Sequence, residues 1–137
     1  MYKVKKVKKD IGTRIVTLKN METGNLDECY DDSVVQWKTN FDFIRKNKLY
    51  DCKIALLAYP IEQLEVLRYG VTSIFSVVGA EKIGTKEMAK LELNGNYYYI
   101  EQETIKDYVK ENKVILWCKK KNLIQVNDVV QPAMLLK

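Results

Sequence analysis

The pair Asn94-Gly95 constrains the fold of this chain more than any other feature of its sequence. The segments on both sides of the pair alternate between apolar and polar residues. Asn-Gly in that setting predicts a two-residue hairpin with a type I′ turn, in which both turn residues need positive φ. A turn of fixed length fixes the register of the two strands, so Leu93 is expected opposite Asn96 and Ala89 opposite Ile100.

This register assigns a face to each side chain of the hairpin, because directly opposed residues share a face. One set is apolar and is expected to point inward: Ala89, Leu91, Leu93, Tyr98 and Ile100. The other set is expected to point toward solvent or a partner: Lys90, Glu92, Tyr97 and Tyr99. The sequence therefore predicts that one of the three consecutive tyrosines is buried and that two are displayed.

A second stretch, residues 49–59, predicts a strand that runs from the rim of a β core into its middle. Every second residue from Tyr50 to Ala58 is apolar. The other parity is polar at Asp51 and turns apolar from Ala55 onward. Because side chains alternate across a strand, the first half is expected to be buried on one face and the second half on both.

The N-terminal part predicts further antiparallel strands. Residues 2–19 form one long strand or two, because the apolar pattern slips by one position near Lys5-Lys6, where we expect a bulge, and Gly12 offers a second bend. A hairpin loop follows with Gly24 at positive φ, and residues 26–31 form the returning strand. The register of that strand stays open between two apolar pairings, Leu18 with Tyr30 and Ile15 with Cys29.

The remaining segments carry shorter patterns. Helical turns are expected at 32–37, 60–70 and 104–111. Strands are expected at 71–78, 114–118 and 123–126, with a loop over 80–86 and a link over 119–122. Between the first helical turn and the central strand, Phe41, Phe43 and Ile44 are expected to pack as a plug. The apolar tail 129–136 is expected to seal the fold or to pair two copies.

These elements predict a mainly β fold with minor α, a small closed or nearly closed β-barrel with one or two short helices. The order of elements over residues 2–78 is similar to that of an OB-fold, with additional strands at the C-terminus. The chain has 137 residues, of which 47% are hydrophobic and 30% charged. With no repeat and no linker, it is expected to be a single domain over 1–137.

Few residues carry recognisable chemistry. The chain has no histidine, which removes the commonest general base and metal ligand. It has no phosphate-binding glycine loop, and the spacing of its three cysteines favours free thiols. A carboxylate cluster is interpreted as a solvated acidic turn or helix cap rather than a cation site: Asp27, Glu28, Asp31 and Asp32. We expect no catalytic residue, metal or cofactor, although a carboxylate or tyrosine acting as acid or base keeps an enzyme as a third possibility.

Two surfaces are candidates for binding. The displayed face of the Asn-Gly hairpin combines aromatic and charged residues and is the candidate partner-binding site: Tyr97, Tyr99, Lys90 and Glu92. The first strand carries a basic patch: Lys3, Lys5, Lys6, Lys8 and Lys9. These lysines could contact the phosphates of a nucleic acid, or they could keep an exposed strand edge from pairing with another chain. We favour the second interpretation.

The function that follows is a non-enzymatic binding module, with a protein as the expected partner and an inhibitor, immunity or adaptor role. The alternative is an OB-like protein that binds single-stranded DNA or RNA. The net charge of +5 allows either. The basic N-terminus lacks the apolar stretch of a signal peptide, and no apolar run is long enough to span a bilayer, so we expect a cytoplasmic protein without membrane association.

Overall fold

The computed structural model describes residues 1–32, 41–63 and 71–136. In that part of the chain a single ten-stranded sheet dominates. Its strands are β1 (Tyr2–Asp10), β2 (Thr13–Asn20), β3 (Leu26–Asp31), β4 (Leu49–Tyr50), β5 (Cys52–Pro60), β6 (Val71–Ile83), β7 (Lys86–Leu93), β8 (Asn96–Glu101), β9 (Lys113–Val126) and β10 (Val129–Val130). Within the same described residues, three short helical segments join the sheet: η1 (Ile61–Gln63), α2 (Gln102–Ile105) and η2 (Pro132–Leu135).

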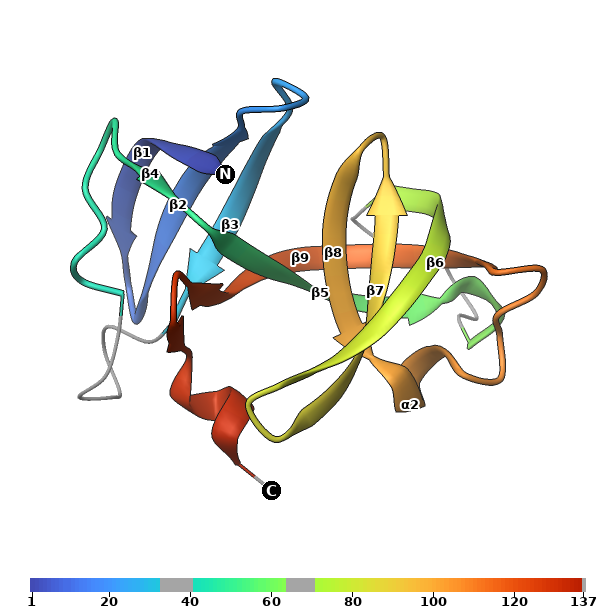
Figure 1. The fold of residues 1–137 in the computed structure, drawn as a ribbon. Helices are drawn as coiled ribbons and strands as arrows, with labels where there is room; N and C mark the ends of the chain where they lie inside the picture. The colour runs from blue at the N-terminus through green and yellow to red at the C-terminus, as the bar shows by residue number, and fades with distance from the viewer. Residues whose placement is uncertain (33–40, 64–70, 137) are drawn as a thin grey trace.

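Five of these strands close into a barrel, which lies beside the first three strands in Figure 1. Their order around the ring is β5-β8-β7-β6-β9, and β9 returns to β5. The β5–β8 pair is parallel, and the other four pairs are antiparallel. The predicted mainly β fold with a closed barrel is therefore confirmed.

The first three strands form an antiparallel meander beside the barrel, which we call the N-terminal arm (residues 1–32 and 41–50). Its last strand joins β9 in parallel at Tyr30 and Asn122. At its other side β4 pairs with β1 and leads across Asp51 into β5. The arm thus begins and ends on the β5–β9 pair, which runs through both halves of the molecule (Figure 1).

The barrel does not lie over residues 2–78, where the order of elements is similar to that of an OB-fold, because the ring is built from strands between Cys52 and Val126. The reason is the length of β9. Residues 113–118 of this strand pair with β6, and Asn122 pairs with β3. Its other edge pairs with β5 from Leu116 to Val126. One strand therefore serves the barrel and the arm, and the short separate strands expected at 114–118 and 123–126 are a single strand.

Several local predictions are confirmed. The β7–β8 register places Leu93 opposite Asn96 and Ala89 opposite Ile100. The β1–β2 register shifts between Val4 and Lys6, which is the expected bulge. The backbone at Gly24 has φ of +78°, as the turn requires.

Other local predictions are wrong or fall outside the described residues. The segment 80–83 is strand rather than loop, because a bulge between Val77 and Gly79 lets β6 continue. The β2–β3 register opposes Ile15 to Tyr30, one residue from the expected pairing with Cys29, and places Leu18 opposite Asp27. The helical residues expected at 33–37 and 64–70 lie outside the described part of the chain.

The core has two parts. The larger cluster fills the barrel and the space between barrel and arm, and it includes the predicted plug residues Phe41 and Ile44. The smaller cluster lies on the other face of the β7–β8 hairpin: Ile83, Met88, Tyr99, Ile124 and Met134. Met134 belongs to η2, so the apolar tail seals part of the chain's own surface.

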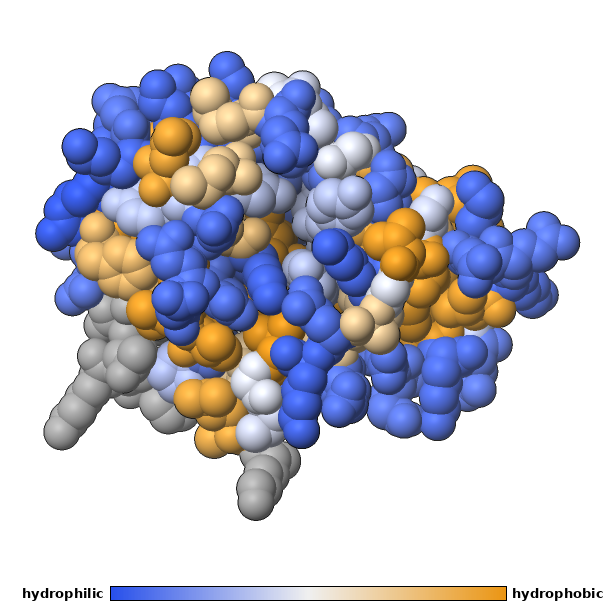
Figure 2. Space-filling model, in the orientation of Figure 1, coloured by the Kyte–Doolittle hydropathy of each residue, from blue (hydrophilic) through white to orange (hydrophobic). Residues whose placement is uncertain are grey.

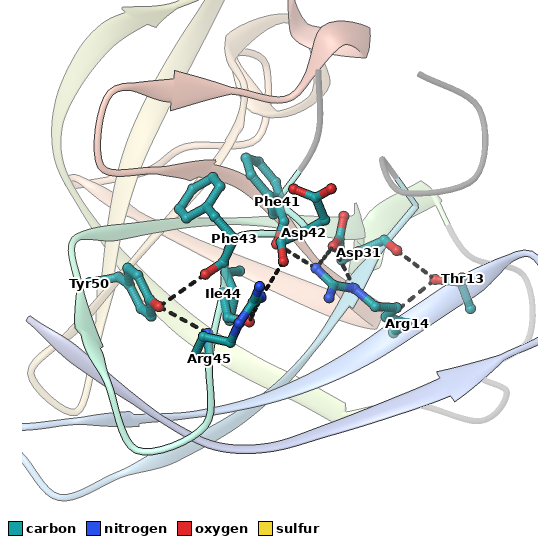
Figure 3. A network of polar contacts seen from close by, with 9 residues as sticks. All are labelled: Thr13, Arg14, Asp31, Phe41, Asp42, Phe43, Ile44, Arg45 and Tyr50. Atoms are coloured by element: carbon teal, nitrogen blue, oxygen red, sulfur yellow. Dashed lines mark hydrogen bonds and ion pairs between the residues drawn. The ribbon is translucent and has the colours of Figure 1, made fainter. Parts of the chain in front are cut away.

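A polar network fastens the segment after residue 40 onto strands β2 and β3 of the arm (Figure 3). The guanidinium of Arg14 donates to the carboxylate of Asp31 at 2.7 Å and to the backbone oxygen of Phe41 at 2.6 Å. Further along, the hydroxyl of Tyr50 accepts the backbone N–H of Arg45 at 2.9 Å. Because Arg14 and Asp31 are both buried, each neutralises the charge of the other.

Candidate functional site

The outward face of the β7–β8 hairpin places three of the four predicted partner-binding residues as expected. Tyr97 is 46% exposed, and the ammonium of Lys90 lies 4.4 Å from the centroid of its ring. Glu92 lies opposite Tyr97 on β7, and its carboxylate accepts the backbone N–H of Gly95 at 3.1 Å. The cation–π contact restricts the ring of Tyr97 while leaving part of it open to a partner.

Tyr99, the fourth predicted residue, is not displayed. Its side chain is 5% exposed and packs in the smaller core cluster with Met134. The alternation of the strand is correct, but the outward face is covered at this position, where Tyr99 packs with Ile83, Met88, Ile124 and Met134. Burial raises the pKa of the Tyr99 hydroxyl, and its hydrogen bond with Glu81 adds to that increase.

Tyr97 and Lys90 stand at a cleft of about 420 Å³ between the N-terminal arm and the barrel. The cleft is lined by residues from both parts: Met1, Tyr2, Asn20, Glu22, Asp51, Cys52, Lys53, Lys90, Gly95, Tyr97, Tyr99, Gln125, Asn127 and Asp128. Three carboxylates and the ammonium groups of two lysines therefore share this lining with several amides. A surface of this kind is suited to a partner that carries both signs of charge.

The charged groups beside Tyr99 form an ion pair with each other. The ammonium of Lys53 lies 3.1 Å from the Glu81 carboxylate and 5.7 Å from the ring centroid of Tyr99. Burial alone would raise the pKa of Glu81, but hydrogen bonds from Tyr99 and Lys53 outweigh it and lower the pKa. The carboxylate is thus held ionised, and this side of the cleft is a fixed polar network.

The predicted basic patch lies on β1 and is separate from the cleft, since none of its five lysines lines that cleft. Lys3 is half-buried, and the others are exposed. The segment before β4 lies against the same strand, because the backbone N–H of Asn47 donates to the carbonyl of Val4 at 2.7 Å. That segment brings further cations to this strand: Arg45, Lys46 and Lys48.

The carboxylate cluster is not a solvated acidic turn at two of its four members. Asp27 is 3% exposed and pairs with the ammonium of Lys121, and Asp31 is fully buried against Arg14. In the residues that the structure describes, no group of three or more potential ligands is placed to hold a metal ion. These two carboxylates tie strands together.

The cysteine thiols are poorly placed for nucleophilic chemistry. All three are free, and Cys29 is fully buried. Burial raises the pKa of the Cys52 thiol to about 12, and the pKa values of Cys29 and Cys118 are raised for the same reason. Since the thiolate is the nucleophile, burial favours the less reactive, protonated form of these groups.

Sequence reasoning missed an apolar stripe on the outer face of the barrel. Ile74 on β6 lies directly opposite Ile115 on β9, and they are 58% and 37% exposed. Trp117 follows on the same face and stacks on Tyr59 with ring centroids 6.1 Å apart. The signal was present, because residues 114–118 are apolar in both parities. Figure 2 shows apolar side chains on both halves of this face of the molecule, including the half that carries β6.

Comparisons with protein-family models, with curated proteins and with solved structures find no match to this chain. Among the helices in the described part of the chain, none has the length and apolar character needed to cross a membrane. The geometry of the surfaces is therefore what a functional proposal has to rest on.

Proposed function

We propose that this chain is a non-enzymatic binding module that docks onto a protein partner through Tyr97 and the adjoining cleft. The observation that carries the proposal is the position of Tyr97. An aromatic ring, nearly half exposed and fixed by Lys90, stands at the rim of a cleft of about 420 Å³. An inhibitor, immunity or adaptor protein would act through such a surface without chemistry of its own.

Physical reasons favour a protein at this cleft. Tyrosine is enriched at the few interface residues that carry most of the binding energy, and a ring that is already restricted loses little freedom on binding. The cleft presents carboxylates from Glu22, Asp51 and Asp128 beside the ammonium groups of Lys53 and Lys90. A polyanion would be repelled by the first three groups, whereas a protein surface can match both signs.

The test is affinity capture from a nuclease-treated native lysate with the immobilised full chain. A specific protein should be retained by the unmodified chain and lost with Tyr97→Ala. Tyr97→Phe should retain most of the binding, because the ring and its contact with Lys90 remain. The melting temperature of each variant shows whether the fold is intact.

One control variant addresses the other exposed apolar surface. Ile74→Ser removes the most exposed member of the outer stripe without touching the cleft. If a retained protein is lost with Ile74→Ser and kept with Tyr97→Ala, the docking surface is the stripe and the assignment to the cleft is wrong. If nothing is retained at all, a protein partner in that lysate is excluded.

The second candidate function is OB-like binding of single-stranded DNA or RNA, and the order of strands in the barrel favours it. Taken from β6, the ring runs β6-β7-β8 antiparallel, then β8–β5 parallel, and β9 closes it between β5 and β6. We infer that this pairing is similar to an OB barrel whose final strand stands first in the chain. The β7–β8 face would then be the face on which OB barrels bind oligonucleotides.

Two features of that face place this candidate second. Burial of Tyr99 leaves one displayed aromatic ring where a stacking platform uses several, and the carboxylates of the cleft oppose phosphate. If the OB-like reading is correct, an oligonucleotide should bind at low salt, and both Tyr97→Ala and Lys90→Ala should weaken it. Unchanged binding in both variants would remove the β7–β8 face as the site.

A further inference from the structure

The outward face of the N-terminal arm is basic. Opposed residues of β1, β2 and β3 share a face, and Val16, Leu18 and Cys29 are fully buried on the inner one. The outward face carries four lysines: Lys3, Lys6, Lys8 and Lys19. Among the described residues of these strands, the outward carboxylates are Asp10 and Glu28, and Asp10 lies at the turn, where it accepts the backbone N–H of Ile11.

An aromatic ring lies on the same face. Lys8, Ile15 and Tyr30 are directly opposed in one row across β1, β2 and β3. The ammonium of Lys120 lies 4.7 Å from the ring centroid of Tyr30. The row therefore runs from a lysine at the edge of the arm to an aromatic ring and a second lysine where the arm meets β9.

The face leads into a cavity of about 390 Å³ at this junction. The β6–β9 pairing ends at Cys118 and the β3–β9 pairing lies at Asn122, so Lys119, Lys120 and Lys121 occupy the interval between them. The cavity is lined by residues of β9 and of four other strands, β3, β6, β7 and β8: Glu28, Tyr30, Val71, Ser73, Phe75, Leu93, Tyr98, Cys118, Lys119, Lys120 and Lys121.

The lining combines two kinds of chemistry. Val71, Phe75 and Leu93 supply an apolar wall next to the two tyrosines. Lys121 is engaged by the buried carboxylate of Asp27, and Lys120 lies 3.9 Å from Asp32, so Lys119 is the most available cation. A flat aromatic group fits the apolar part, and a phosphate fits the lysines at the rim.

We propose that the outward face of β1–β3, together with this cavity, binds a single-stranded nucleic acid. Lys3, Lys6, Lys8 and Lys19 contact phosphates, and one unpaired base enters the cavity beside Tyr30. Charge complementarity favours a polyanion as the ligand, because lysines outnumber carboxylates on this face and continue to the rim of the cavity. The aromatic and apolar wall carries the choice of a single strand, because a base held in a duplex cannot enter.

This surface is distinct from the cleft proposed for a protein partner, because no residue in the described part of the chain lines both the cleft and the cavity. The inference does not rest on that proposal, and it also differs from OB-like binding at β7–β8. Oligonucleotide binding to variants of Tyr97 and Tyr30 therefore separates the two nucleic-acid surfaces, and the capture experiment with Tyr97→Ala tests the protein partner.

The experiment measures fluorescence anisotropy of a labelled single-stranded oligothymidine of about 12 nucleotides, a length within the usual site size. We expect binding at low salt that falls as salt rises, with a slope of about −0.7 for each phosphate neutralised. The double variant Lys6→Ala, Lys8→Ala should reduce that slope by roughly 1.4. Lys113→Ala, an exposed lysine at the far end of β9, is the matched control and should leave it unchanged.

The base-binding role is tested at Tyr30. Tyr30→Ala should weaken binding roughly tenfold or more, because one base loses its stacking partner. Tyr30→Leu keeps apolar bulk without a π-face and should give an intermediate loss, which guards against a folding defect in the smaller variant. Tyr97→Ala should bind as the unmodified chain does.

Several outcomes would overturn the proposal. One is an absence of oligonucleotide binding at low salt, and another is an equal loss with Lys113→Ala and with the double lysine variant. A duplex that binds as tightly as the single strand, with no effect of Tyr30→Ala, would exclude base entry. Polyglutamate binding at least as tight as the oligonucleotide, again insensitive to Tyr30, would assign the face to an acidic protein instead.

Discussion

The hydroxyl of Tyr98 donates a hydrogen bond to the carboxylate of Asp27 and so joins the barrel to the N-terminal arm. The two residues are 71 positions apart in the sequence, and the hydroxyl lies 2.9 Å from the nearer carboxylate oxygen. Each is 3% exposed. The ammonium of Lys121 pairs with the same carboxylate, so the buried charge has both a neutral donor and a cation.

Removing that hydroxyl should destabilise the fold. We expect Tyr98→Phe to lower the free energy of unfolding by about 1.5–3 kcal/mol, the usual value for a hydrogen bond to a charged group. The measurement is urea denaturation at neutral pH. Tyr97→Phe is the matched control on the neighbouring residue, and it should change the free energy by less than about 0.5 kcal/mol because its side chain is exposed. Equal effects of the two variants would contradict the assigned role of Tyr98.

The two tyrosines on either side of Tyr98 should also differ when they are truncated. Tyr99→Ala removes a ring packed against Met134 and should cost about 3–5 kcal/mol of unfolding free energy. Tyr97→Ala should cost far less, because nearly half of its side chain is already in solvent. Thermal melts of both variants give the comparison. A small loss for Tyr99→Ala would mean that the residue is displayed, as the alternation of the strand alone predicts.

Local sequence patterns correctly predicted those structural features that depend on residues close together in the chain. The Asn94-Gly95 turn fixes the β7–β8 register because both turn residues take positive φ. The bulge after Val4 follows from a one-residue slip in the apolar pattern. Each of these features is decided within a few residues, so the chain carries the whole signal where the feature lies.

Features that depend on distant contacts were not predictable from the same patterns. The lysines at 119–121 resemble a link between strands, but β9 continues through them because β5 pairs along its other edge. The alternation of β8 predicts an outward Tyr99, and packing with residues distant in the sequence buries it: Ile83, Ile124 and Met134. The basic face around Tyr30 forms only with the register of β1, β2 and β3 and with the interval on β9 between its pairings with β6 and β3. Neither feature can be predicted from the sequence pattern.

The turn between β6 and β7 should tolerate no side chain at Gly84. A Cβ there would overlap the backbone oxygen of Met134, and φ is +60°. The same turn holds η2, because the backbone N–H of Thr85 donates to Met134 at 2.8 Å. We expect Gly84→Ala to cost about 1 kcal/mol for the backbone conformation and roughly 1–3 kcal/mol more for the overlap.

Gly12→Ala separates the two contributions. Gly12 has φ of +72°, and a Cβ there would meet nothing within 4 Å, so this variant should show the conformational cost alone. Urea denaturation gives both values, and carboxypeptidase digestion reports whether η2 has been released in Gly84→Ala. Equal losses in the two variants would show that η2 does not pack closely on this turn.

Stability should be lost on the alkaline side of neutral pH. Burial raises the pKa of six groups in the folded state, the phenols of Tyr2, Tyr98 and Tyr99 and the thiols of Cys29, Cys52 and Cys118. Above the pKa of each group in the unfolded chain, about 8.5 for cysteine and 10 for tyrosine, the folded state binds more protons than the unfolded state. The free energy of unfolding therefore falls as pH rises from about 8.5, and these six groups contribute their full stabilisation below that pH.

Urea denaturation at a series of pH values from 6 to about 11 measures this loss, and the unmodified chain should show a flat region up to about pH 8 followed by a fall. Histidine is absent, so no imidazole titration should disturb the flat region. Tyr98→Phe removes one of the six groups and should flatten the fall above pH 10, although the variant is less stable at neutral pH. A free energy of unfolding that stayed constant to pH 11 would show that the phenols and thiols are as accessible to water in the folded chain as in the unfolded one.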